Sequence, residues 1–94
     1  MAVLDRALKQ VEFRFDGRCV PGARSVMLVA SFNRWDSAAQ PLRRGIDDWW
    51  TAAVWLPAGD YEYLFVVDGV PWNDPHDDGR RANEWGGEYS LKHV

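Results

Sequence analysis

The sequence predicts an antiparallel β-sandwich of about seven short strands. Three observations lead to this fold class. Apolar and polar residues alternate in several short runs, turn residues separate those runs, and no segment shows strong helical periodicity. The 94 residues fit one domain spanning 1–94, which is long enough to build a core without a disulfide or a metal.

The first half of the chain is expected to contribute three strands. Gln10–Asp16 alternates apolar Val11, Phe13 and Phe15 with charged residues, and residues 1–9 before it are expected to be a loosely ordered lead-in. Pro21-Gly22 then interrupts the chain, and Ala23–Ala30 resumes the alternation. Leu42–Arg44 is a short third strand that ends at a glycine.

The second half carries the clearest strands. Trp49–Leu56 alternates over its whole length, and Asp60 to Trp72 is expected to form the central hairpin of the domain. Asp68-Gly69 is the strongest short-range signal for a tight turn, and Pro71 places the returning strand at an edge. Residues 73–87 are polar and predict a long loop before a last strand, Tyr89–Val94. The expected core consists of Val26, Leu28, Phe32, Trp50, Val54, Tyr63, Phe65 and Val67.

Composition limits the class of protein. Cys19 is the only cysteine, so an internal disulfide is impossible and a reducing compartment, the cytoplasm, is expected. The charged opening residues lack the apolar run of a signal peptide, and no apolar stretch approaches the roughly 20 residues of a membrane helix. The formal net charge of −3 disfavours nucleic acid as a partner.

Six tryptophans are unusual in a chain of this length. A core this small cannot bury six indoles and also give each N–H a partner, so some are expected at the surface, where clustered indoles mark a binding site. Trp49 and Trp55 share the outer face of their strand. They are expected to pack on the N-terminal segment, and a protein interface is the alternative.

The charged residues do not predict catalysis or a metal cofactor. The loop around Asp74 and Asp77 resembles a calcium loop, but His76 stands at its third position and Trp85 at its twelfth, so a solvated acidic loop is expected. The histidines and the cysteine lack the spacing of a zinc site. Asp47-Asp48 are adjacent and point apart, unlike a glycosidase pair.

Three motifs follow one another in the order of a known module: SFNRW, WLPAGDYEYLFVVDGVPWNDP and NEWGGEYSL. Together they resemble carbohydrate-binding module family 48, from about Val11 to Val94. This family includes the glycogen-binding domain of the AMP-activated protein kinase β subunit and the domain before the catalytic barrel of isoamylases and glycogen branching enzymes. The resemblance implies an immunoglobulin-like early-set sandwich that binds α-glucan and is not an enzyme.

The resemblance also implies the site residues. Trp35 of FNRW and Trp72 after the hairpin turn correspond to family tryptophans that stack on glucose rings, and Asn33 is expected at the same site. Trp85 stands where the kinase subunit has a leucine that inserts between sugar units. An alternative for Trp35 and Trp72 is that they only pin loops onto the sandwich. For Trp85, the favoured interpretation is that its indole caps one end of the core.

Two positions depart from the family pattern. Leu64 replaces a lysine that reaches a sugar hydroxyl, and Tyr89 replaces an asparagine that also bonds sugar. Neither replacement offers the same hydrogen bonds, so these departures predict weaker or altered glycan binding.

Three functions are therefore open. The first is a non-catalytic α-glucan-binding module, which the intact Trp35 and Trp72 favour. The second is a protein-interaction module that has the same fold and a weakened or lost sugar site, which Leu64 and Tyr89 favour. The third is a hydrolase accessory or degenerate enzyme fragment. The implied partners are α-1,4-glucan or glycogen and a glycogen-metabolism enzyme or another protein, without nucleic acid or membrane.

Overall fold

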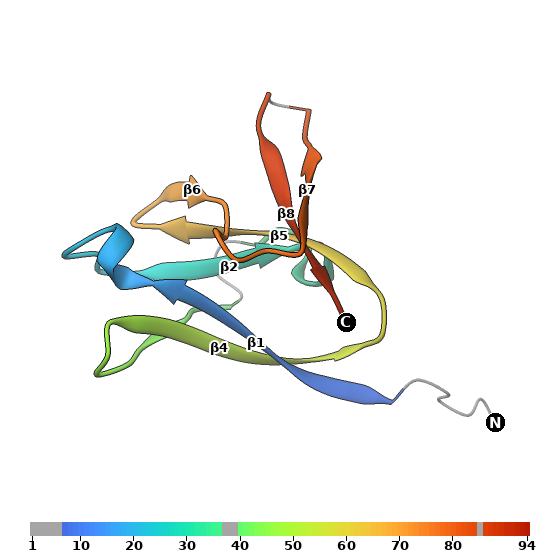
Figure 1. Cartoon of the computed structure of the whole chain (residues 1–94), viewed down its shortest axis with the longest axis horizontal. Coiled ribbons are helices and arrows are strands. Elements are labelled where there is room, and N and C mark those ends of the chain that lie inside the picture. The colour runs from blue at the N-terminus through green and yellow to red at the C-terminus, as the bar shows by residue number, and fades with distance from the viewer. Residues whose placement is uncertain (1–6, 37–39, 85) are drawn as a thin grey trace.

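The computed structural model describes residues 7–36, 40–84 and 86–94 and shows two antiparallel β-sheets packed against each other (Figure 1). One sheet has the order β1-β4-β3 and the other β2-β5-β8-β7, with β6 paired to β5. The predicted antiparallel sandwich is confirmed. The strands are β1 (Leu8–Asp16), β2 (Val26–Ala30), β3 (Arg43–Arg44), β4 (Trp49–Pro57), β5 (Asp60–Val67), β6 (Val70–Trp72), β7 (Gly79–Ala82) and β8 (Glu88–His93).

Three strand predictions need correction. β1 begins at Leu8 inside the expected lead-in, because Leu8 and Lys9 extend the ladder with β4. β2 begins at Val26 rather than at residue 23, because the N–H groups of residues 24 and 25 donate to the Asp68 carboxylate, each at 2.9 Å, and not to a neighbouring strand. The predicted loop over 73–87 contains β7, which pairs with β8 although its sequence GRRA has no apolar alternation.

Aromatic side chains of both sheets fill the space between them. The Tyr63 ring meets Phe13 edge-on at a centroid distance of 5.0 Å, and the Phe65 ring meets Phe15 at 5.4 Å. All four side chains are almost completely buried. Such edge-to-face pairs stabilise a core beyond the area they bury. The predicted core is confirmed, with Phe32 and Val54 partly buried against it and the other six residues buried.

The outer face of the three-stranded sheet carries the two tryptophans expected there. Trp49 packs against β1, because the Arg14 guanidinium lies over its ring at 4.5 Å from the centroid. Trp55 is 60% exposed and stands opposite Gln10. Packing therefore accounts for Trp49 and leaves most of the Trp55 side chain at the surface.

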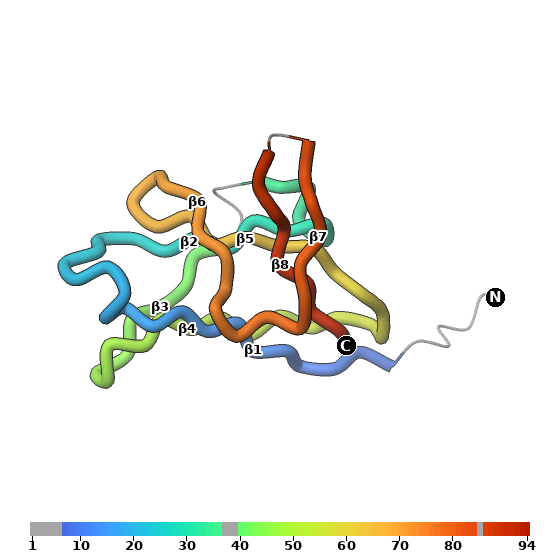
Figure 2. The backbone as a smooth tube through the Cα atoms, turned by 45° about the horizontal axis from the view of Figure 1, so that its top comes forward, coloured from blue at the N-terminus to red at the C-terminus, as the bar shows by residue number. Residues whose placement is uncertain are grey.

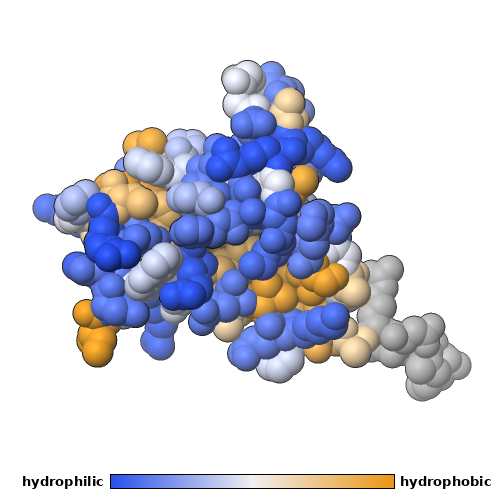
Figure 3. All heavy atoms as spheres, in the orientation of Figure 1, coloured by the Kyte–Doolittle hydropathy of each residue, from blue (hydrophilic) through white to orange (hydrophobic). Residues whose placement is uncertain are grey.

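The β7–β8 hairpin stands out from the body of the sandwich, and the segment that follows β2 lies beside it (Figure 2). This arrangement brings residues near position 35 next to residues near position 89. Within the described residues, no helix is long and apolar enough to cross a membrane. The face seen in Figure 3 is mostly hydrophilic, with hydrophobic areas between the hydrophilic residues.

Candidate functional site

A tight turn after β2 sets the position of Trp35. The short 3-10 helix Ser31–Asn33 is followed by two residues in left-handed conformation, Arg34 with φ 58° and Trp35 with φ 59°. The Asn33 side chain holds this turn: its Oδ1 accepts from the Ala30 N–H and its Nδ2 donates to the Leu28 carbonyl, both at 2.9 Å. Asn33 was predicted as a carbohydrate-binding residue, and the structure shows it bonded to the turn that carries Trp35.

Trp35 stacks on Tyr89. The two ring centroids are 4.7 Å apart and the planes differ by 29°. Successive side chains of a strand point to opposite faces, and Ser90 of β8 is buried. Its neighbour Tyr89 therefore points away from the core. The Trp35 side chain nevertheless remains 37% exposed. A tryptophan and a tyrosine 54 positions apart thus form one exposed aromatic surface.

The Tyr89 hydroxyl is held by an acidic neighbour. Its oxygen lies 3.1 Å from Glu84 Oε1, to which it donates. Partial desolvation, and secondly this hydrogen bond, raise the pKa of Tyr89 above its ordinary value. The phenol therefore stays protonated at neutral pH and donates its proton to Glu84 at the edge of the stack.

Leu64 lies on the same side of the sheet as Tyr89. Its neighbours in sequence, Tyr63 and Phe65, both face the core, so Leu64 points outward, opposite Val29 of β2. We call Trp35, Tyr89 and Leu64 together the outer-face site. The structure brings these three predicted site residues to one face of the five-stranded sheet.

Trp72 lies on the other side of that sheet. It stands directly opposite Phe65 in the β5–β6 hairpin, and directly opposed residues share a face. Its ring meets Phe15 of the other sheet edge-on, with 6.0 Å between centroids, while 37% of the side chain stays exposed. The structure therefore does not place Trp72 beside Trp35, and a sugar contact by Trp72 stays a prediction. Trp85 lies outside the described residues.

An ion pair that sequence reasoning missed completes the surroundings of the outer-face site. Arg81 of β7 stands directly opposite Tyr89, and its Nη1 lies 3.3 Å from Glu62 Oε2 of β5. A cavity of about 290 Å³ opens beside this pair, and Ser31, Leu91 and His93 also line it. No signal in the sequence pointed to Arg81, because its segment was predicted as a loop.

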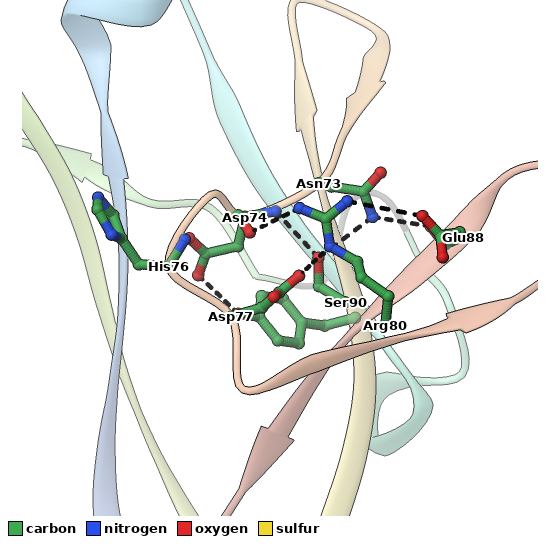
Figure 4. A network of polar contacts seen from close by, with 8 residues as sticks. Asn73, Asp74, His76, Asp77, Arg80, Glu88 and Ser90 are labelled. Atoms are coloured by element: carbon green, nitrogen blue, oxygen red, sulfur yellow. Dashed lines mark hydrogen bonds and ion pairs between the residues drawn. The ribbon is translucent and has the colours of Figure 1, made fainter.

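The acidic loop between β6 and β7 is anchored rather than solvated (Figure 4). Asp74 is 6% exposed, accepts a 2.6 Å hydrogen bond from the Tyr63 hydroxyl, and donates its N–H to Ser90 Oγ at 3.0 Å. Arg80 is paired with Asp77 and donates to the Asp74 carbonyl at 3.3 Å. The expectation of a solvated loop is wrong for Asp74, because these donors compensate its burial. The described residues contain no cluster suited to a metal ion.

Comparison with known proteins shows the family of this chain. Residues 10–90 match the family described as the glycogen recognition site of AMP-activated protein kinase. The chain is 36% identical over 78 residues to the 5'-AMP-activated protein kinase subunit beta-1 of Sus scrofa. This similarity covers 80% of the chain but only 58% of the relative's length.

Proposed function

Because the chain belongs to the family of glycogen recognition domains of AMP-activated protein kinase, we propose that it is a non-catalytic module that binds α-1,4-glucan. The observation that carries this proposal is the exposed Trp35 ring stacked on Tyr89 at the outer face. The expected partners are glycogen and, through it, enzymes of glycogen metabolism. A reducing cytoplasm fits the exposed, unpaired Cys19.

The chemistry of an indole suits the flat side of a sugar. The C–H bonds on one face of a pyranose form an apolar surface that packs against an aromatic ring, while its hydroxyls need hydrogen-bond partners at the rim. Tyr89 supports one side of the Trp35 ring, and the exposed part of Trp35 is the stacking surface for glucose. Asn33 holds the turn and so orients the ring before sugar arrives.

Titration of the protein with maltoheptaose tests this proposal. An exposed indole changes its surroundings when a sugar stacks on it, so tryptophan fluorescence should respond, and glycogen in a native gel should retard the protein. Trp35→Ala should abolish both effects. Trp55→Ala is the matched control, since Trp55 is also exposed but projects from the other sheet.

Two results would contradict the proposal. One is a wild-type protein that ignores maltoheptaose and glycogen at millimolar concentration. The other is a Trp35→Ala variant that binds as well as the wild type. The second candidate function, a protein-interaction module, rests on the 60% exposure of Trp55, and it would then become the function to test.

A further inference from the structure

We propose that Arg81 and Glu62 form the hydrogen-bonding part of the glucan site, beside the aromatic surface of Trp35 and Tyr89. This inference rests on the proposed function and names the residues that select sugar hydroxyls. It assigns a binding role to an ion pair on two strands, one of which the sequence pattern did not predict.

The position of the pair is the first argument. β8 lies between β5 and β7, so the Arg81 side chain must cross β8 on the outer face to reach Glu62. Arg81 starts directly opposite Tyr89, where Cβ atoms in antiparallel sheets are about 5 Å apart. Glu62 lies two residues before Leu64, roughly 7 Å along the same face of β5. The ion pair therefore borders the outer-face site.

The chemistry of the pair is the second argument. A guanidinium has five N–H donors, and the hydrogen bond to Glu62 uses one of them, while a carboxylate accepts at two oxygens. Neighbouring hydroxyls of a glucose unit both donate and accept, so this combination matches a sugar diol. Leu64 has no polar group, and the single Tyr89 hydroxyl already donates to Glu84. Arg81 and Glu62 add a charged donor and a charged acceptor beside the stack.

The open space beside the pair is the third argument. The cavity of about 290 Å³ has Glu62 and Arg81 in its lining, and Ser31 beside them places a hydroxyl at its wall. The Arg81 side chain is 66% exposed and that of Glu62 is 26% exposed, so a ligand can reach both. An exposed ion pair contributes little to stability, so replacing either partner should leave the fold intact.

A second ion pair shows what makes this one different. Glu12 and Arg14, 3.5 Å apart, lie on the outer face of the other sheet. There the Arg14 guanidinium itself covers the Trp49 ring, and the exposed Trp55 stands opposite Gln10 rather than opposite either member of the pair. Glu12–Arg14 therefore serves as a matched control for Glu62–Arg81.

Isothermal titration with maltoheptaose tests the inference. Arg81→Met and Glu62→Gln should each raise the Kd about tenfold, since each removes a charged hydrogen-bonding partner. Arg14→Met and Glu12→Gln should leave the Kd within twofold of the wild type. The swapped variant, Arg81→Glu with Glu62→Arg, retains an ion pair but misplaces donor and acceptor, and it should bind as weakly as the single variants. Thermal melting of each variant checks the fold, and Arg81→Lys replaces any Arg81→Met protein that fails to fold.

The outcomes separate this inference from the proposed function. If Trp35→Ala abolishes binding while both Arg81→Met and Glu62→Gln bind within twofold of the wild type, the pair has no role and the inference is overturned. Full binding by the swapped variant would also overturn the inference. It would show that binding needs an ion pair between these strands but not a donor at position 81 and an acceptor at position 62. If the wild type shows no affinity at millimolar concentration, the proposed function fails and this inference fails with it.

Discussion

Trp72 stands opposite Phe65 in the β5–β6 hairpin, and its ring meets Phe15 of the other sheet at a centroid distance of 6.0 Å. The indole therefore extends the aromatic core at its edge. Trp35 stacks on Tyr89 at the opposite, outer face of the same sheet. Two tryptophans that look equivalent in the sequence thus have different surroundings, and mutation should separate them.

Trp72→Ala should destabilise the fold more than Trp35→Ala does. Removing a partly buried indole that packs on Phe15 should cost about 2 kcal/mol of unfolding free energy, below the range for fully buried aromatics. Trp35→Ala should cost less than about 1 kcal/mol, since its ring lies outside the core. Urea denaturation measures both values. A loss below about 1 kcal/mol for Trp72→Ala would show that the packing of Trp72 on Phe15 contributes little stability.

Deleting Pro71 should move Trp72 to the outer face. Side chains alternate along a strand, so a hairpin shortened by one residue places Trp72 opposite Val66 instead of Phe65. A second exposed indole near the outer-face site should strengthen maltoheptaose binding by about fivefold, while the melting temperature falls because the contact with Phe15 is lost. Pro71→Val is the control, because it retains the register. Identical affinities in the two variants would show that an indole opposite Val66 does not reach the bound sugar.

The sequence predicted most of the core but not the partners at the site. Alternation along β1, β2, β4 and β5 predicted which residues are buried. A strand that packs one face on the core must place its apolar residues on that face. β7 was missed because GRRA has no such pattern, and its pairing depends on β8. Arg81 was missed with it.

The sequence pattern likewise did not predict the contacts between residues that are far apart in the chain. The FNRW motif predicted an exposed Trp35, but its stacking on Tyr89 depends on how the turn and the β7–β8 hairpin come together. The face of Trp72 depends on hairpin register, in which a single residue decides between the core and the surface. Local propensity carries no information about either relationship.

Leu64→Lys should strengthen glucan binding by about 1 kcal/mol if the new ammonium bonds a sugar hydroxyl beside Trp35. Val66→Lys is the control, since it adds the same charge two residues along the same face of β5. Calorimetric titration with maltoheptaose compares the two. Equal affinities for Leu64→Lys and Val66→Lys would show that position 64 is not part of the site.

The Tyr63–Asp74 hydrogen bond should make the domain sensitive to alkali. Burial, and secondly the bond to Asp74, raise the pKa of Tyr63 well above its ordinary value of 10.0. A raised pKa in the folded state means that this contribution to stability is complete below pH 10. Above about pH 10 the unfolded chain loses the phenol proton first, so the unfolding free energy should fall by up to about 1.4 kcal/mol per pH unit.

Tyr63→Phe tests this linkage. The variant should be less stable at pH 7 by about 1–3 kcal/mol, because the buried Asp74 carboxylate loses a donor, yet it should lose less stability than the wild type between pH 10 and 11. Tyr61→Phe is the control: it removes a hydroxyl bonded to the Pro57 carbonyl at 2.7 Å and leaves Tyr63 in place. Urea denaturation at each pH gives the free energies. Parallel losses in the wild type and in Tyr63→Phe would show that Tyr63 is not the group that couples folding to alkali.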